Sequence, residues 1–175
     1  MITSYHLSLS KNGGEIRKIR FVVLPLIVAA VAVTGCSGPE RDSAGMVVEA
    51  GAEQVQDIRV GDCVEQLGNP GSKSSIVSGD VGVVPCDKPH RFEAYRVTDS
   101  ALTSFSDMQL QEEADSLCSS AFQNYVGIAF ERSALNFTSL IPTPEGWRDG
   151  DREITCALML ANESSFTGSL RGSAQ

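Results

Sequence analysis

The clearest pattern of apolar and polar positions lies between residues 106 and 127 and predicts an amphipathic helix. Apolar and small residues recur there three or four positions apart, as one buried face of a helix requires. The predicted buried face holds Leu110, Ala114, Leu117, Cys118, Ala121 and Tyr125, and the solvent face holds Glu112, Glu113, Asp115 and Ser119. Ser106 and Gln109 have the spacing of a capping box at the start. Gly127 is a natural C-terminal stop.

Strand-like segments flank this helix on both sides. Residues that favour strands are concentrated in 58–67, 76–86, 90–99, 134–144 and 153–162, with turn-forming residues between the segments. Gly61 and Asp62 should interrupt the first segment, and Pro85 should end the second. The last two segments are joined by a connection rich in Pro and Gly, which predicts turns. The expected fold class is therefore α+β, with one main amphipathic helix packed on a small, mostly antiparallel sheet.

The apolar run at residues 21–33 is shorter than the roughly 20 residues that span a membrane as a helix. It follows several basic residues and ends in VTGC at 33–36, which resembles a bacterial lipobox. A basic segment, a short apolar segment and small residues before a cleavage point are typical of an export signal. We expect residues 1–35 to be a lipoprotein signal peptide and Cys36 to carry the lipid. The alternative is a short membrane helix that stays attached, with Cys36 incidental.

The segment after the lipobox is small, polar and acidic, which predicts a flexible tether over residues 36–56. The folded domain is expected over residues 57–172, with residues 173–175 frayed. Two or three acyl chains on Cys36 would give stable attachment. The predicted location is therefore the extracytoplasmic face of the cell membrane.

The charge of the chain excludes one class of partner. The full chain has 14 basic and 22 acidic residues, and residues 1–35 hold four of the basic and one of the acidic ones. The remaining chain has ten basic and 21 acidic residues, a net charge of −11. Nucleic-acid binding requires a basic surface, so no nucleic-acid partner is expected. Electrostatic adhesion to anionic lipid is disfavoured for the same reason.

Four cysteines remain in the predicted domain. In an oxidising compartment, Cys63, Cys86, Cys118 and Cys156 should form two disulfides, for which three pairings exist. Cys63 and Cys86 both lie in the strand-rich first half, whereas Cys118 lies on the buried face of the helix that should cover Cys156. We therefore predict the pairs Cys63–Cys86 and Cys118–Cys156. A zinc site that includes Cys86 and His90 is the competing interpretation, but it lacks a second closely spaced ligand pair. No cofactor and no metal is expected.

Several short motifs occur in a fixed order along the predicted domain. They are VGDC at 60–63, VPCDKPH at 84–90, a cysteine in the helix, PTPEGWRDGDREITCAL at 142–158 and TGSLRG at 167–172. This order resembles the septum formation family of actinobacterial exported and membrane-tethered proteins, over about residues 57–172. The resemblance implies a link to cell division or to biogenesis of the cell envelope.

His90 is the one candidate general base in the predicted domain, because the pKa of histidine lies near neutrality. No nucleophile motif accompanies it. We therefore favour a structural histidine whose ring bonds to the backbone near the turn at Cys86.

The loop around Trp147 contains the other candidate chemistry. Asp149, Asp151 and Glu153 begin like a calcium loop, but the glycine and glutamate that an EF-hand needs are missing. We instead predict a turn in which Asp151 and Arg152 pair locally. Trp147 either stacks on a wall sugar or a protein partner, or closes one end of the core over a disulfide, which we favour. The candidate interaction surface comprises His90, Trp147, Arg148, Asp151 and Arg152.

These observations leave three functional hypotheses. The first is a lipid-anchored, non-enzymatic domain that presents a surface to a protein of the envelope or division machinery. The second is a protein that binds or modifies a cell-wall polymer through Trp147 and nearby acids. The third is a redox sensor that uses Cys63 and Cys86.

Overall fold

The computed structural model describes residues 38–67 and 79–175. Its main sheet has the strand order β3-β5-β4-β6-β8-β7, and every neighbouring pair in it is antiparallel. The strands of this sheet are β3 (Gly51–Gln54), β4 (Cys63–Gln66), β5 (Asp80–Val84), β6 (Phe92–Asp99), β7 (Leu135–Leu140) and β8 (Glu153–Leu160). The short strands β1 (Glu40–Arg41) and β2 (Val47–Glu49) form a separate pair. The predicted α+β fold class is confirmed.

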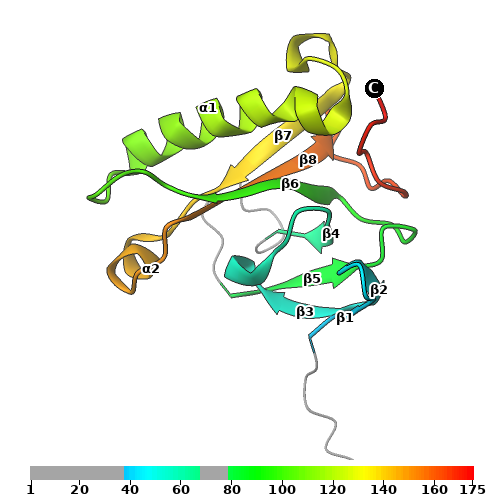
Figure 1. Ribbon diagram of the computed structural model, residues 1–175, viewed down its shortest axis with the longest axis horizontal. Helices are drawn as coiled ribbons and strands as arrows, with labels where there is room; N and C mark the ends of the chain where they lie inside the picture. Colours follow the sequence, from blue (N-terminus) through cyan, green and yellow to red (C-terminus); the bar gives the residue numbers. More distant parts are fainter. Residues whose placement is uncertain (1–37, 68–78) are drawn as a thin grey trace, which may run out of the picture. The chain divides into compact units, whose positions relative to one another are not determined.

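Helix α1 (Asp107–Val126) lies over strands β6, β7 and β8 (Figure 1). At its start the Ser106 hydroxyl accepts a hydrogen bond from the backbone N–H of Gln109. At its end Gly127 adopts a left-handed conformation, with φ 93°, which glycine reaches without the steric cost of a Cβ. The predicted boundaries are confirmed. Phe122, which the helical pattern did not include, is among the largest fully buried side chains.

Strand β8 is covered on both faces, which explains why its sequence is almost continuously apolar. Cys156 and Leu158 belong to the core under α1, with Tyr95 and Phe122. Ala157 faces the other way, into a second core formed mainly by β4, β5 and β6. Because side chains alternate across a strand, a strand covered on both faces is apolar at nearly every position.

Two disulfides connect the elements as predicted. Cys63 on β4 is bonded to Cys86, which follows β5, and Cys118 on α1 is bonded to Cys156 on β8. The bonded residues are 23 and 38 positions apart. In the chain-entropy model each closure of this length stabilises the fold by about 3 to 4 kcal/mol.

The expected flexible tether over residues 36–56 is wrong for the part that the structure describes. Strand β3 pairs with β5 along its full length, from Gly51 opposite Val83 to Gln54 opposite Asp80. The backbone of Pro39 crosses so close to Gly51 that a Cβ there would lie 2.5 Å from the Pro39 nitrogen. The physical reason is pairing across the sheet, which a polar, acidic composition did not reveal.

Two smaller expectations also need correction. Residues 173–175 do not fray, because the Ala174 N–H donates a hydrogen bond of 2.9 Å to the Val126 carbonyl at the end of α1. The turn-rich connection before β8 contains a short helix, α2 (Pro144–Arg148), whose first turn is capped by the Thr143 hydroxyl. A Pro at the first turn of a helix is favourable, since its missing N–H has no partner there.

The predicted signal peptide and Cys36 lie outside the described residues. Within residues 38–67 and 79–175, no helix is long and apolar enough to cross a membrane.

Candidate functional site

Trp147, the only tryptophan of the chain, is part of the core and not of an exposed surface. Its side chain is 7% exposed and packs in a cluster with Leu110 and Ile154, and its ring meets Phe105 at a centroid distance of 6.0 Å. The Arg152 guanidinium covers the indole at 3.7 Å from the ring centroid. The favoured prediction of a tryptophan that closes one end of the core is confirmed, but the described cluster around it contains no disulfide. The exposed stacking surface is wrong, because helix α2 turns the indole inward.

Arg148, Asp151 and Arg152, the other residues of the predicted loop surface, do not form a shared binding site. Arg152 donates to the backbone carbonyls of Trp147 and Asp151, at 2.8 and 2.6 Å, so the predicted local pair with the Asp151 carboxylate is not formed. The Asp151 carboxylate instead accepts the backbone N–H of Glu153. Arg148 is exposed and pairs with Glu145 at 2.8 Å. The polar side chains of this loop therefore bond mainly to the loop's own backbone, and the loop closes one end of the core.

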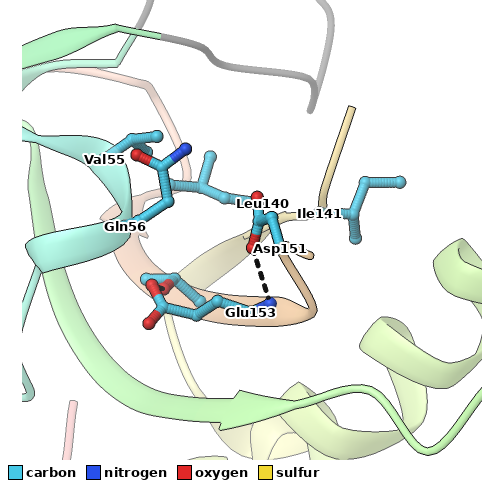
Figure 2. A pocket seen from close by; sticks show the side chains of 7 residues that line it. Val55, Gln56, Leu140, Ile141, Asp151 and Glu153 are labelled. Carbon is cyan, nitrogen blue, oxygen red and sulfur yellow. Dashed lines mark hydrogen bonds between the residues drawn. The ribbon is translucent and has the colours of Figure 1, made fainter. Parts of the chain in front are cut away.

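Asp151 and Glu153 line a small cavity with Val55, Gln56, Leu140, Ile141 and Thr155 (Figure 2). Its volume of about 20 Å³ has room for about one water molecule and no more. Partial burial raises the pKa of Glu153 to about 7, and the neighbouring carboxylates of Asp151, Asp99 and Asp57 add to this rise. The protonation of Glu153 therefore changes near neutral pH. The cavity is too small for an organic ligand.

His90 is fully buried, as expected for a structural histidine. Its Nδ1 lies 2.8 Å from the Lys88 carbonyl, and its backbone pairs with Phe166 in an isolated bridge. The predicted ring-to-backbone hydrogen bond next to Cys86 is confirmed. Because His90 is buried, however, it is not part of an exposed interaction surface.

A larger concave surface, which we call the Tyr125 pocket, lies between β6 and the C-terminal half of α1. It is lined by Val60, Tyr95, Arg96, Val97, Ala121, Asn124, Tyr125 and Arg171, and its volume is about 300 Å³. This is at the lower limit of the volumes found for ligand pockets. Tyr95 and Tyr125 of this lining belong to the core under α1, and Ala121 packs against that core, so packing fixes their positions.

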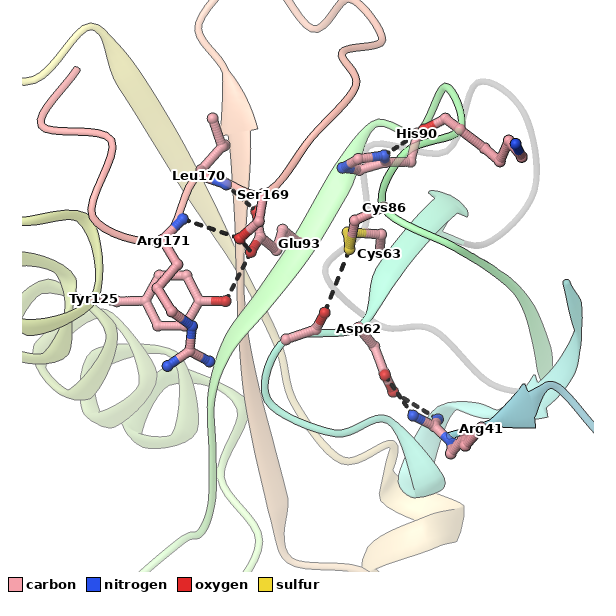
Figure 3. The surroundings of a disulfide bond; sticks show 12 residues. Arg41, Asp62, Cys63, Cys86, His90, Glu93, Tyr125, Ser169, Leu170 and Arg171 are labelled. Atoms are coloured by element: carbon pink, nitrogen blue, oxygen red, sulfur yellow. Dashed lines mark hydrogen bonds and ion pairs between the residues drawn. A yellow bond between two sulfur atoms is a disulfide. The ribbon is translucent and has the colours of Figure 1, made fainter. Parts of the chain in front are cut away.

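The two tyrosines of the pocket use their hydroxyls to bond into the protein. The Tyr95 hydroxyl donates to the Cys118 carbonyl at 2.8 Å. The Tyr125 hydroxyl donates to Glu93 Oε1 at 2.7 Å (Figure 3). Burial raises the pKa of both phenols well above the usual value, with the Glu93 carboxylate adding to the effect at Tyr125. Both rings therefore stay neutral and act as apolar walls.

The positive charge of the pocket comes from Arg96 and Arg171. The Arg171 guanidinium lies over the Tyr125 ring, 4.3 Å from its centroid. Among the described residues, neither guanidinium has a carboxylate within ion-pair distance. Both arginines are exposed. The pocket therefore presents two cations to solvent beside aromatic and apolar walls, in a chain that carries an excess of acidic residues.

Sequence reasoning did not find this pocket. Its residues come from four separate parts of the chain, around positions 60, 96, 124 and 171, and no spacing rule connects them. One indication of the pocket was present in the sequence, since Arg171 belongs to the TGSLRG motif. The described lining contains no carboxylate, histidine, serine or cysteine, so its side chains offer binding groups and no nucleophile or general base near neutral pH.

Together these features define a small α+β domain, held by two disulfides, with a cationic and aromatic pocket. The family model for septum formation matches residues 60–175, which is more than half of the chain. The chain therefore belongs to the septum formation family, as the order of its motifs suggested. This membership indicates a role in septum formation or in the cell envelope. No curated protein matches the chain, and no solved structure matches it.

Proposed function

We propose that this protein is a lipid-anchored, extracytoplasmic, non-enzymatic domain that binds a protein partner during septum or envelope formation. The observation that carries the proposal is the Tyr125 pocket, in which Arg96 and Arg171 lie beside Tyr95 and Tyr125 and have no ion-pair partner in the described part of the chain. The occupant that fits it is an acidic segment of the partner.

Charge complementarity supports this occupant. A guanidinium binds carboxylates with two parallel hydrogen bonds, and Arg and Tyr are enriched among the residues that dominate binding energy at interfaces. Four other basic side chains, those of Arg41, Lys88, Arg91 and Arg148, already pair with acidic neighbours. Within residues 38–67 and 79–175, Arg96 and Arg171 have no such neighbour, so an incoming carboxylate displaces no acidic partner there.

The lipid anchor is supported by the lipobox at residues 33–36. The folded part begins at Glu40, so at most about 14 Å of extended chain separates it from Cys36. A lipid on Cys36 would therefore hold the domain close to the membrane surface. The partner segment is then expected at the membrane surface too, and not deep in the wall.

A cell-wall polymer is the alternative ligand, since wall peptides also carry carboxylates. This alternative depended on an exposed Trp147, and the indole is buried. We therefore favour a protein partner over a cell-wall polymer as the ligand.

The test uses a photoreactive amino acid at Val97, which lines the pocket, in growing cells of the native host. We expect one dominant protein adduct, and we expect the double variant Arg96→Gln/Arg171→Gln to abolish it. The control Arg132→Gln/Arg148→Gln removes the same charge at positions outside the pocket and should retain the adduct. An adduct that is equally strong in both double variants, or binding of the unmodified protein to purified peptidoglycan that depends on Arg96 and Arg171, would reject the protein-partner proposal.

A further inference from the structure

A second group of polar side chains lies in the interior, and it adjoins the Tyr125 pocket through the Tyr125 hydroxyl, which bonds to Glu93. The ligand-type atoms of Cys63, His90 and Glu93 all lie within 4.8 Å of one another, and all three residues are buried. Cys86 brings a second sulfur to the same place, because it is bonded to Cys63 (Figure 3). Two sulfurs, one imidazole and one carboxylate form a donor set that suits zinc.

His90 is already oriented as a metal-binding histidine. A backbone carbonyl can only accept a hydrogen bond, so the contact of 2.8 Å to the Lys88 carbonyl places the proton on Nδ1. Nε2 then carries a lone pair. It is buried and, within the described part of the chain, has no hydrogen-bond partner. Metal-bound histidines usually donate their second ring N–H to a carbonyl or carboxylate in this way. A buried polar atom without a partner is costly, and a metal ion would satisfy it.

Glu93 is held by a shell of donors on its other side. Its Oε1 accepts from the hydroxyls of Tyr125 and Ser169, and its Oε2 accepts from the Leu170 N–H (Figure 3). These three bonds keep a carboxylate in the interior, where an unpaired charge would be unfavourable. Counted over the residues that the structure describes, Oε2 accepts this one bond, so a second lone pair remains for a ligand. Hydrogen bonds of this kind to a metal-binding carboxylate orient it and tune its affinity.

We propose that reduction of the Cys63–Cys86 disulfide converts this cluster into a zinc site, with Cys63, Cys86, His90 Nε2 and Glu93 Oε2 as the four ligands. The oxidised form holds the disulfide and no zinc, and the reduced form holds zinc in its place. The proposal does not rest on the partner proposed for the Tyr125 pocket, although the Tyr125 hydroxyl contacts Glu93 and so joins the two sites.

The chemistry balances with a dithiol as reductant. The dithiol gives two electrons and two protons to the disulfide, which becomes two thiols while the dithiol becomes a disulfide. Zn²⁺ then binds the two sulfurs as thiolates, and two protons are released to solvent. Cys86 is partly exposed and can be attacked, whereas both sulfurs of the Cys118–Cys156 bond are buried. Breaking the bond lets the sulfurs separate to about 3.8 Å, the spacing of two thiolates on a tetrahedral zinc ion.

The test uses the full chain with Cys36→Ser, which removes the fifth thiol, purified in detergent. The protein is reduced with dithiothreitol, freed of it under argon, and titrated with Co²⁺ and then with Zn²⁺. We expect one Co²⁺ per chain with thiolate-to-cobalt charge-transfer absorption and the visible bands of a tetrahedral ion, which Zn²⁺ displaces. The oxidised protein should show none of these bands.

Two variants assign the ligands. Cys63→Ser/Cys86→Ser leaves only Cys118 and Cys156 and should lose the charge-transfer bands. His90→Ala should weaken Co²⁺ affinity at least tenfold and shift the visible bands. Absence of the bands in the reduced protein, or an unchanged affinity in His90→Ala, would overturn the proposal. If reduction alone abolishes the thermal unfolding transition, Zn²⁺ should restore it, and a failure to do so would overturn the proposal as well.

Discussion

Arg41 binds the buried carboxylate of Asp62 with two hydrogen bonds, Nη1 to Oδ1 at 2.6 Å and Nη2 to Oδ2 at 2.9 Å (Figure 3). The same guanidinium also pairs with Glu53 on β3. Asp62 in turn accepts the Arg59 N–H and lies directly before Cys63. The segment next to the predicted anchor is therefore joined by charge to the strand that carries the first disulfide.

Arg41→Ala should destabilise the domain, because it leaves the buried Asp62 carboxylate without its cation. Removing one partner of a buried pair costs up to about 3 kcal/mol where the other partner cannot reach water freely. Urea denaturation of the purified protein measures this free energy of unfolding. Arg91→Ala is the control, since its guanidinium lies 4.0 Å from Glu163 at the surface, and an exposed pair of this kind contributes under about 1 kcal/mol. Equal losses in the two variants would contradict the proposed role of the Arg41 bonds.

Cys118→Ala should destabilise the domain more than any surface substitution. It removes a crosslink worth about 3 to 4 kcal/mol and leaves the buried Cys156 as a free thiol. The midpoint of thermal unfolding measures the effect, with Ser119→Ala on the exposed side of α1 as the control. An unchanged midpoint in Cys118→Ala would be incompatible with the pairing.

The carboxyl group of Glu153 should make the fold less stable as the pH rises toward neutrality. Burial raises its pKa to about 7 in the folded state, from an ordinary value of 4.5. Between these two values the unfolded chain has lost this proton and the folded chain retains it, so the free energy of unfolding falls as pH increases. The contribution is fully present below about pH 4.5 and is lost above about pH 7.

Glu153→Gln, which cannot ionise, should remove this pH dependence. Because the side chain is only partly buried, we expect it to be about 1 kcal/mol more stable than the unmodified protein at pH 8, after discounting for solvent screening, and no more stable at pH 4. Urea denaturation at a series of pH values measures the difference, with Glu112→Gln on the exposed side of α1 as the control. Parallel pH curves for the unmodified protein and Glu153→Gln would exclude Glu153 as their cause.

Cys36→Ala should release the protein from the membrane, because it removes the predicted site of lipid attachment. Metabolic labelling with a radioactive fatty acid, followed by detergent phase partitioning, measures both attachment and distribution. Globomycin, which blocks the lipoprotein signal peptidase, should cause accumulation of the uncleaved chain. Fatty-acid label that persists in Cys36→Ala would show that the lipobox interpretation is wrong.

The parts of the fold that were predictable depend on near neighbours in sequence. The ends of α1 follow from Ser106 and Gly127, whose effects act within one helical turn. The disulfide between Cys118 and Cys156 was predictable because a helical pattern placed the first on a buried face and an apolar strand carried the second.

The parts that were not predictable depend on which elements meet. An acidic, small-residue composition is typical of a tether, and only the pairing of Gly51–Gln54 with β5 makes it a strand. Trp147 occupies a Pro- and Gly-rich loop, and only the turn of α2 directs its indole into the core.

By itself, the sequence determined the α+β class, the main helix, the two disulfides and the family. Each depends on a local period, a cap or a motif in fixed order. Only the tertiary structure decided that Arg96 and Arg171 share one pocket and that Cys63, His90 and Glu93 share one buried cluster. These groups are brought together by sheet pairing and by the packing of the C-terminal segment against β6. Contacts such as the bond between Leu170 and Glu93, which are 77 positions apart, leave no periodic trace in the sequence.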